Sequence, residues 1–256
     1  MRYFKLRRSQ NILLSFVLIS VLVTAFPTID LAISRKFFHA NSFLVNRWWQ
    51  TLLHVGLGYF LCASMAAVVA LYTYNRLWKR NVCDVDGRRV VYLLLVLIIG
   101  AGLIVNVIFK DNFGRARPRD VAEFGGTRQF APAFTVSGEC ATNCSFSSGD
   151  AAGAFFSLAL ALALSRRRAL FVAGIAAGVL VSFARISSGA HFFSDTVVSF
   201  FVMLIAADAL YYYVVMTHAD REVVIRANDG FRPAYATATA TVGPRIEAAP
   251  APVRPA

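Results

Sequence analysis

Three short segments of the chain carry cationic, acidic and imidazole side chains in spacings that suit chemistry on a phosphate group. They cover residues 110–117, 144–150 and 185–195. Lys110, Arg117 and Arg185 are cations that can converge on one phosphate dianion, because the planar fork of an arginine donates to two oxygens at once. Phosphate binding is therefore the first chemistry that these residues indicate.

His191 and Asp195 lie four residues apart, which is one turn of a helix. The carboxylate can therefore bond one ring nitrogen and leave the other free to attack phosphorus. Ser148 and Gly149 stand where an apolar stretch begins, so backbone N–H groups and the helix dipole can bind an anion there. Singly, each residue has an ordinary explanation as a helix cap or an interfacial charge. Together they indicate a catalytic site.

These segments connect apolar stretches that are long enough to cross a membrane. The chain has 256 residues, of which 57% are hydrophobic, against roughly 45–50% in soluble domains. Six stretches predict transmembrane helices, namely residues 11–31, 50–73, 90–109, 149–165, 169–187 and 196–217. We expect an all-α polytopic membrane protein with one six-helix domain over residues 1–218, in which the first helix is retained rather than cleaved.

The basic residues indicate how these helices are oriented. If the helices alternate from a cytoplasmic N-terminus, most of the 26 Lys and Arg residues fall on the cytoplasmic side, in agreement with the positive-inside bias. This bias accounts for most of the net charge of +12 without a nucleic-acid partner. The same alternation places both termini in the cytoplasm and all three chemical segments on the periplasmic face. Charges at such positions are costly and usually functional.

The predicted outer loop also holds Cys140 and Cys144. In an oxidising periplasm they can form a small disulfide ring, and free thiols are an equal alternative. No histidine lies near them in the sequence, so we expect no metal site. Residues 219–256 are rich in Ala, Pro and Thr and lack apolar periodicity, so we expect a disordered cytoplasmic tail.

At these residues the sequence resembles the type-2 phosphatidic acid phosphatase superfamily, over roughly residues 10–217. The family carries Lys-x6-Arg-Pro, Pro-Ser-Gly-His and Ser-Arg-x5-His-x3-Asp. The corresponding strings here are Lys110…Arg117-Pro118, Ser147-Ser148-Gly149-Asp150 and Ala184-Arg185…His191…Asp195. The second string lacks the proline and ends in aspartate instead of histidine. Longer strings around the motifs are similar to the lipid A 4′-phosphatase branch of bacterial inner membranes, which also tolerates this aspartate.

The resemblance implies a mechanism that needs no cofactor and no metal. The implied phosphate-binding residues are Lys110, Arg117, Ser148, Gly149 and Arg185. His191, oriented by Asp195, attacks phosphorus to give a phosphohistidine that water hydrolyses. The family's second-motif histidine protonates the leaving oxygen, and Asp150 occupies that position here. An aspartate with an ordinary pKa of about 3.9 is a poor proton donor at neutral pH, so a water molecule, or no general acid, is the alternative.

The expected substrate is the 4′-phosphate of lipid A at the periplasmic leaflet, whose removal lowers surface charge and weakens the binding of cationic peptides. Arg115, Arg119 and Arg128 suggest a basic rim for its bulky headgroup, or one that contacts any anionic lipid. Nearby phenylalanines are expected among acyl chains, namely Phe113, Phe124, Phe130 and Phe134. The alternatives are another lipid phosphate, such as undecaprenyl diphosphate or phosphatidylglycerophosphate, and a non-catalytic lipid-binding protein.

Overall fold

The computed structural model describes residues 5–44, 47–165 and 167–216. The predicted tail at 219–256 lies outside the described residues. The helices in chain order are α1 (Lys5–Ala25), α2 (Thr28–Arg35), α3 (Arg47–Trp78), α4 (Gly87–Leu95), the π-helical η1 (Val96–Lys110), α5 (Gly149–Leu164), α6 (Arg168–Ser187), α7 (Phe193–Leu210) and η4 (Tyr211–Val215). A hairpin of β1 (Phe38–His39) and β2 (Ser42–Phe43) follows α2, and two single turns, η2 (Pro118–Asp120) and η3 (Ala122–Phe124), lie in the long loop.

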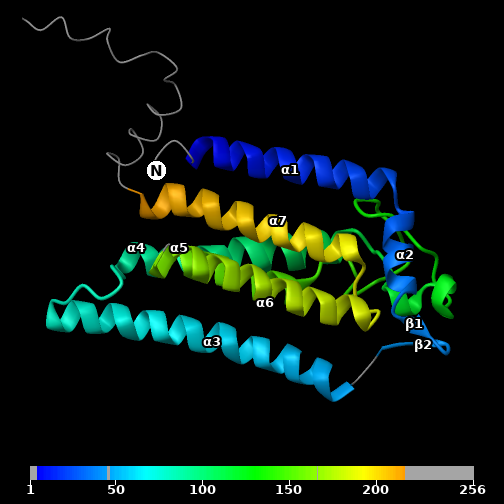
Figure 1. Cartoon of the computed structure of the whole chain (residues 1–256), viewed down its shortest axis with the longest axis horizontal. Coiled ribbons are helices and arrows are strands. Elements are labelled where there is room, and N and C mark those ends of the chain that lie inside the picture. The colour runs from blue at the N-terminus through cyan, green and yellow to red at the C-terminus, as the bar shows by residue number, and fades with distance from the viewer. Residues whose placement is uncertain (1–4, 45–46, 166, 217–256) are drawn as a thin grey trace, which may run out of the picture.

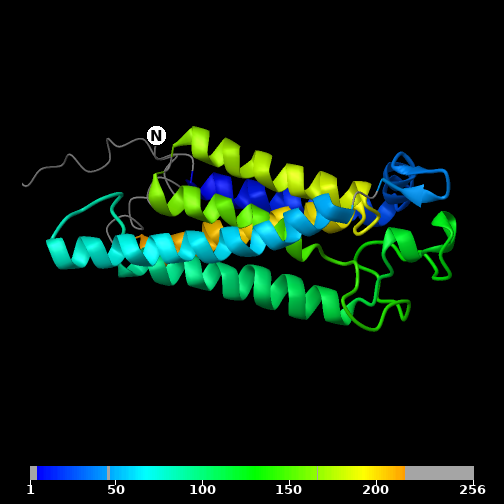
Figure 2. The same cartoon turned by 90° about the horizontal axis from the view of Figure 1, so that it is seen from below.

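The long helices form one bundle in which successive helices run in alternating directions (Figures 1 and 2). The hairpin, α2 and the loop over residues 111–148 gather at one end of this bundle. The same end carries the last residues of η1 and α6 and the first residues of α5 and α7. All three chemical segments of the sequence therefore meet at that end.

Each predicted apolar stretch overlaps a described helix, but only four of the six are confirmed as helices long enough to cross a membrane, or five if the bent pair α1 and α2 is one span. Four helices are long and apolar enough to cross a membrane: Trp48–Trp78, Gly87–Lys110, Arg168–Ser187 and Phe193–Val215. The chain is thus a multi-pass membrane protein. α5 is apolar but has only 16 residues. The single helix predicted over 11–31 is instead two helices, because α1 and α2 meet at an angle of 79°. Pro27 stands between them, and its ring and missing N–H prevent α1 from continuing.

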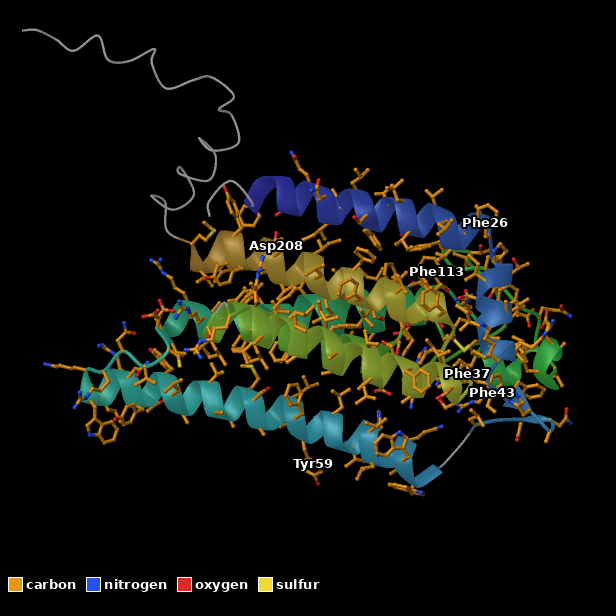
Figure 3. All side chains as sticks on the ribbon, viewed as in Figure 1. Phe26, Phe37, Phe43, Tyr59, Phe113 and Asp208 are labelled. Atoms are coloured by element: carbon orange, nitrogen blue, oxygen red, sulfur yellow. A yellow bond between two sulfur atoms is a disulfide. The ribbon has the colours of Figure 1, made fainter. Side chains whose placement is uncertain are left out.

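α5 lies at the centre of the bundle, in contact with α6, α7 and η1. Most of its residues are buried, and many are alanines, which let the neighbouring helices approach closely. α3 lies at the periphery of the bundle. Only 6% of the most apolar 18-residue segment of this helix is buried, whereas 44% of the corresponding segment of α7 is buried. Tyr59 of α3 points away from the bundle (Figure 3) and is 74% exposed. An apolar face of this kind is suited to lipid.

Candidate active site

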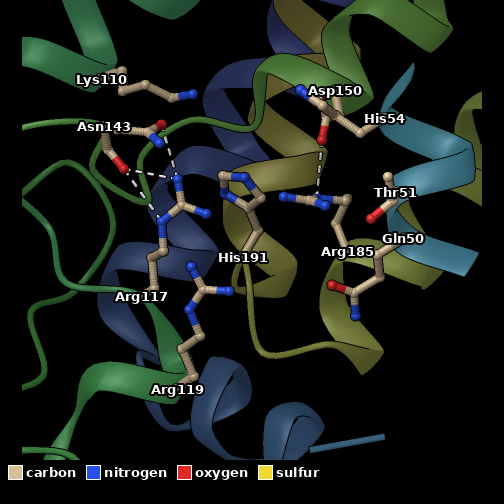
Figure 4. A pocket seen from close by; sticks show the side chains of 10 residues that line it. All are labelled: Gln50, Thr51, His54, Lys110, Arg117, Arg119, Asn143, Asp150, Arg185 and His191. Atoms are coloured by element: carbon tan, nitrogen blue, oxygen red, sulfur yellow. Dashed lines mark hydrogen bonds and ion pairs between the residues drawn. The ribbon is translucent and has the colours of Figure 1, made fainter. Parts of the chain in front are cut away.

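A cavity of about 350 Å³ opens at the end of the bundle where the three segments meet (Figure 4). Its lining residues come from α3, η1, the long loop, α5, α6 and the α6–α7 turn, and they are Gln50, Thr51, His54, Lys110, Arg117, Arg119, Asn143, Asp150, Arg185 and His191. Four of these side chains are cations and one is a carboxylate. The cavity is therefore strongly positive and suited to a dianionic ligand.

His191 reaches the cavity from the turn between α6 and α7. Gly189 adopts φ = +63° in this turn, a conformation that glycine takes without strain. The backbone N–H of His191 then donates to the carbonyl of Arg185 at 3.3 Å. This reversal brings a cation at the end of α6 and an imidazole before α7 to the same cavity.

The tautomer of His191 is fixed by the backbone. Its Nδ1 lies 2.8 Å from the carbonyl oxygen of Ser145, and because a carbonyl only accepts, Nδ1 carries the hydrogen and Nε2 keeps its lone pair. Asp195 Oδ2 lies farther away, at 3.7 Å from Nδ1. The predicted pairing of Asp195 with the ring is thus present only as this longer contact, because the Ser145 carbonyl takes the short hydrogen bond from Nδ1. Burial, opposed by Asp195, lowers the pKa of His191 to about 4, so the imidazole is neutral at physiological pH.

Asp195 acts on His191 through the loop. Its carboxylate is fully buried and accepts hydrogen bonds from the Ser145 hydroxyl at 2.5 Å and from the Phe192 N–H at 2.8 Å. Ser145 thus donates to Asp195 with its side chain and accepts from His191 with its carbonyl. Asp195 fixes the residues on both sides of the imidazole, although it does not hold the ring itself.

Arg115 pairs with Asp195 and lies wholly inside the protein. Its guanidinium donates to Asp195 at 2.5 Å, to Asp30 of α2 at 2.7 Å and to the Ser194 hydroxyl at 2.9 Å. It also stacks 4.3 Å from the Phe192 ring. The predicted role of Arg115 in binding the headgroup is therefore wrong, because its guanidinium forms ion pairs with two buried carboxylates. The bend at Pro27 is what carries Asp30 to this position.

The phenylalanines of the long loop also face inward. Phe113 and Phe134 pack against the buried Phe146 (Figure 3 shows Phe113). Phe124 is 4% exposed and packs against the hairpin, and Phe130 packs against Phe192. The expectation that these rings rest among acyl chains is wrong, since Phe113 and Phe134 pack against the bundle core and Phe124 and Phe130 belong to a second, smaller cluster under the loop.

Arg117 is held by Asn143, a residue that the sequence analysis missed. The Arg117 guanidinium donates to the Asn143 carbonyl oxygen at 2.7 Å and to its side-chain oxygen at 2.9 Å. Asn143 takes a left-handed conformation with φ = +50° inside the ring closed by a Cys140–Cys144 disulfide. The disulfide alternative is therefore the observed one, and it holds the turn that orients Arg117. The sequence signals were its place between the two cysteines and the string Asn143-Cys144-Ser145-Phe146, which is one of those that carry the resemblance, but no role was predicted for its side chain.

Lys110 and Arg185 approach the cavity from opposite sides, and Asp150 lies beside Arg185 (Figure 4). Arg185 Nε is 3.1 Å from Asp150 Oδ2, but this ion pair is poorly aligned, and the buried Nε makes no hydrogen bond among the described residues. A buried donor without an acceptor is costly. A phosphate oxygen in the cavity would supply that acceptor.

Ser148 and Gly149 do not line the cavity. The Ser148 hydroxyl caps α5 by accepting the Ala151 N–H at 3.3 Å. At Gly149 a Cβ atom would lie 2.8 Å from Asn106 Oδ1 and 3.5 Å from Lys110 Nζ. Glycine therefore lets the start of α5 pack against η1 and Lys110. Phosphate binding by the backbone of these two residues stays a prediction.

His54 is the second residue that sequence reasoning missed. It projects from α3, and its Nδ1 lies 2.9 Å from Asp150 Oδ1. It was hidden inside an apolar stretch without a motif, and the available signal was an ionisable residue near the outer end of a membrane helix. Among the residues that the structure describes, no group of three or more His, Cys, Asp or Glu side chains is placed to hold a metal ion.

The fold and the site together define the class of protein. It is a helical membrane protein whose cationic pocket and neutral imidazole are suited to phosphoryl transfer. Residues 89–219 match the PAP2 superfamily. This match covers about half of the chain. In addition, one relative is 32% identical to this chain over 80% of the relative's own length. The chain belongs to the PAP2 superfamily and is a phosphoric monoester hydrolase.

Three similar proteins are named lipid A 4′-phosphatase. The protein of Francisella tularensis subsp. novicida (strain U112) is 32% identical over 177 residues, which cover 67% of this chain and 80% of the relative. That of Rhizobium leguminosarum is 34% identical over 157 residues, covering 59% and 67%. That of Rhizobium etli (strain ATCC 51251) is 40% identical over 157 residues, covering 59% and 61%.

One solved structure is similar in fold. It is a transmembrane PAP2-type phosphatidylglycerolphosphate phosphatase from Bacillus subtilis, with a TM-score of 0.52 and 20% identity. The match covers 82% of this chain and 96% of that one. At this identity the likeness supports the helical arrangement and carries nothing about the substrate.

Proposed function

We propose that this enzyme removes the 4′-phosphate of lipid A through a phosphohistidine on His191. The observation that carries the chemistry is a neutral imidazole whose Nδ1 is fixed by the Ser145 carbonyl, in a cavity that holds four cations. The names of the three relatives support the choice of lipid A. The motif residues would contact the phosphate that all lipid phosphates share, so the relatives, rather than the cavity residues, separate lipid A from other lipid phosphates.

In the proposed mechanism, the cations bind the phosphate and neutralise the charge that develops on it. Nε2 of His191 attacks phosphorus, the bond from phosphorus to the sugar oxygen breaks, and a phosphohistidine forms. Water then attacks phosphorus and releases inorganic phosphate. The Ser145 carbonyl stabilises the ring N–H during attack, and Asp195 keeps Ser145 and the start of α7 in place. The phosphate-binding side chains are Lys110, Arg117, Arg119 and Arg185.

The size of the cavity suits a headgroup rather than a whole lipid. A volume of about 350 Å³ is near the lower end of the roughly 300–1,000 Å³ usual for ligand pockets. The phosphate and part of its sugar fit inside, while the rest of the lipid stays at the membrane. Arg119, half exposed at the cavity, and the exposed Arg128 remain available for further acidic groups of the headgroup.

We also propose the inner membrane as the location, with the cavity at the periplasmic face. The ends of the helices opposite the cavity carry a basic cluster, Arg76, Lys79, Arg80, Arg88 and Arg89, which the positive-inside bias assigns to the cytoplasm. The start of α1 and the end of α7 share that side (Figure 1). The disulfide at the cavity end suits an oxidising compartment.

Expression in a bacterium whose lipid A carries both phosphates tests the proposal. Mass spectrometry should find lipid A that retains the 1-phosphate and lacks the 4′-phosphate, together with weaker binding of cationic peptides. Cells that express His191→Ala to the same level are the control. Lipid A with both phosphates, in membranes that release phosphate from another lipid, would rule out this substrate.

A further inference from the structure

The leaving group of a lipid phosphate needs a proton donor that the second motif does not supply. Expulsion of a sugar alkoxide is difficult without protonation, and a positioned acid contributes roughly 10²–10⁴-fold to such a step. Asp150, at the position of the family's histidine, has a cationic or donor group close to each oxygen. Oδ1 lies 2.9 Å from His54 Nδ1, and Oδ2 lies 3.1 Å from Arg185 Nε. Two cationic or donor partners keep this carboxylate ionised, so it acts as an acceptor.

His54 stands where a proton donor is required. His191 forms the floor of the cavity, with 2% of its side chain exposed, whereas 67% of the His54 side chain is exposed. In-line attack by a nucleophile on the floor drives the leaving oxygen toward the open side. His54 lies on that side, on the α3 wall, across from Lys110 and Arg117 (Figure 4). Because Asp150 engages Nδ1, Nε2 is the nitrogen left to face a substrate.

We infer that the His54–Asp150 pair, contributed by two helices, replaces the single histidine of the second motif, and that His54 Nε2 protonates the leaving oxygen. When His191 forms its bond to phosphorus, the bond from phosphorus to the sugar oxygen breaks, and that oxygen takes the proton from the His54 imidazolium. Neutral His54 then accepts a proton from the water that attacks phosphohistidine, which restores the imidazolium. Asp150 is the positioning residue, since it orients the ring and balances its charge.

The inference rests on the proposed phosphoryl transfer to His191 and does not depend on which lipid is the substrate. The experiment measures kcat/KM of purified wild-type and His54→Asn protein on two substrates. One is the lipid phosphate that the wild type hydrolyses best, with an alkoxide leaving group. The other is an aryl phosphate, whose phenolate leaves without a proton. The matched control is His39→Asn, because His39 is exposed on β1 outside the cavity.

His54→Asn should lower kcat/KM on the lipid about 100-fold and on the aryl phosphate less than about fivefold, while His39→Asn changes neither. Asp150→His should restore part of the loss in the His54→Asn background, since it recreates the family's histidine. An equal loss on both substrates, or a loss on the lipid below about threefold, would overturn the role of His54. If the wild type hydrolyses another lipid but not lipid A, the proposed substrate fails while this test still decides the role of His54.

Discussion

Replacing Arg115 by methionine should destabilise the whole protein rather than weaken lipid binding. Arg115 is completely buried and pairs with Asp30 and Asp195, which are 2% and 0% exposed. Removing one partner of a buried ion pair costs about 3–5 kcal/mol, because the other charge is left uncompensated. Here two carboxylates lose their partner at once, so the upper part of that range applies. In a chain of this size, such a loss lowers Tm by roughly 8–20 °C.

Thermal unfolding of the purified protein in detergent provides the measurement, and Arg119→Met provides the matched control. Arg119 lies four residues away and lines the cavity with half of its side chain exposed. Its replacement should leave Tm within about 2 °C and raise KM for the lipid. If Arg115→Met unfolds at the wild-type temperature and only raises KM, the assignment of Arg115 to a buried network is wrong.

Two further predictions concern the nucleophile and the cation that faces it. Burial lowers the pKa of His191 to about 4. After correction for ionisation of the substrate, kcat/KM for an aryl phosphate should therefore fall only as the pH approaches 4. A fall centred near the ordinary histidine pKa of about 6.5 would contradict the buried neutral ring. Asn143→Ala should lower kcat/KM about tenfold, because Arg117 loses a charge-assisted hydrogen bond worth about 1.5 kcal/mol. Reduction of the Cys140–Cys144 disulfide should lower the wild-type value in the same direction, and an unchanged value in both experiments would exclude this role for the loop.

Hydropathy predicted the helices closely because membrane helices satisfy their backbone internally and carry long apolar runs. The stretch at 169–187 corresponds to α6 at Arg168–Ser187, and the stretch at 90–109 ends one residue before η1 does. The first helix failed at Pro27, where hydropathy stays high while the backbone cannot continue straight. The bend brings Asp30 into contact with Arg115. Hydropathy therefore missed the one break in this helix on which the buried ion-pair network depends.

The polar site was predictable as a set but not in its contacts. The spacing predicted that His191 and Asp195 lie close together. The ring nitrogen Nδ1, however, hydrogen-bonds to the carbonyl of Ser145, which is 46 residues away in the chain. No local pattern reports such a contact, because it depends on how the long loop folds. Arg115 and Arg117 illustrate the same limit. They are two residues apart, and the path of the loop buries one with two carboxylates while it turns the other to the cavity.

The most direct test of this account follows the phosphate itself from lipid to protein. Purified protein is mixed with lipid A that is radiolabelled only at its 4′-phosphate, quenched at short times under alkaline conditions, and digested for mapping. Label should appear transiently on His191, should then be released as inorganic phosphate, and should not appear on His191→Ala protein. Label that stays on the lipid, or that reaches inorganic phosphate without passing through His191, would contradict it.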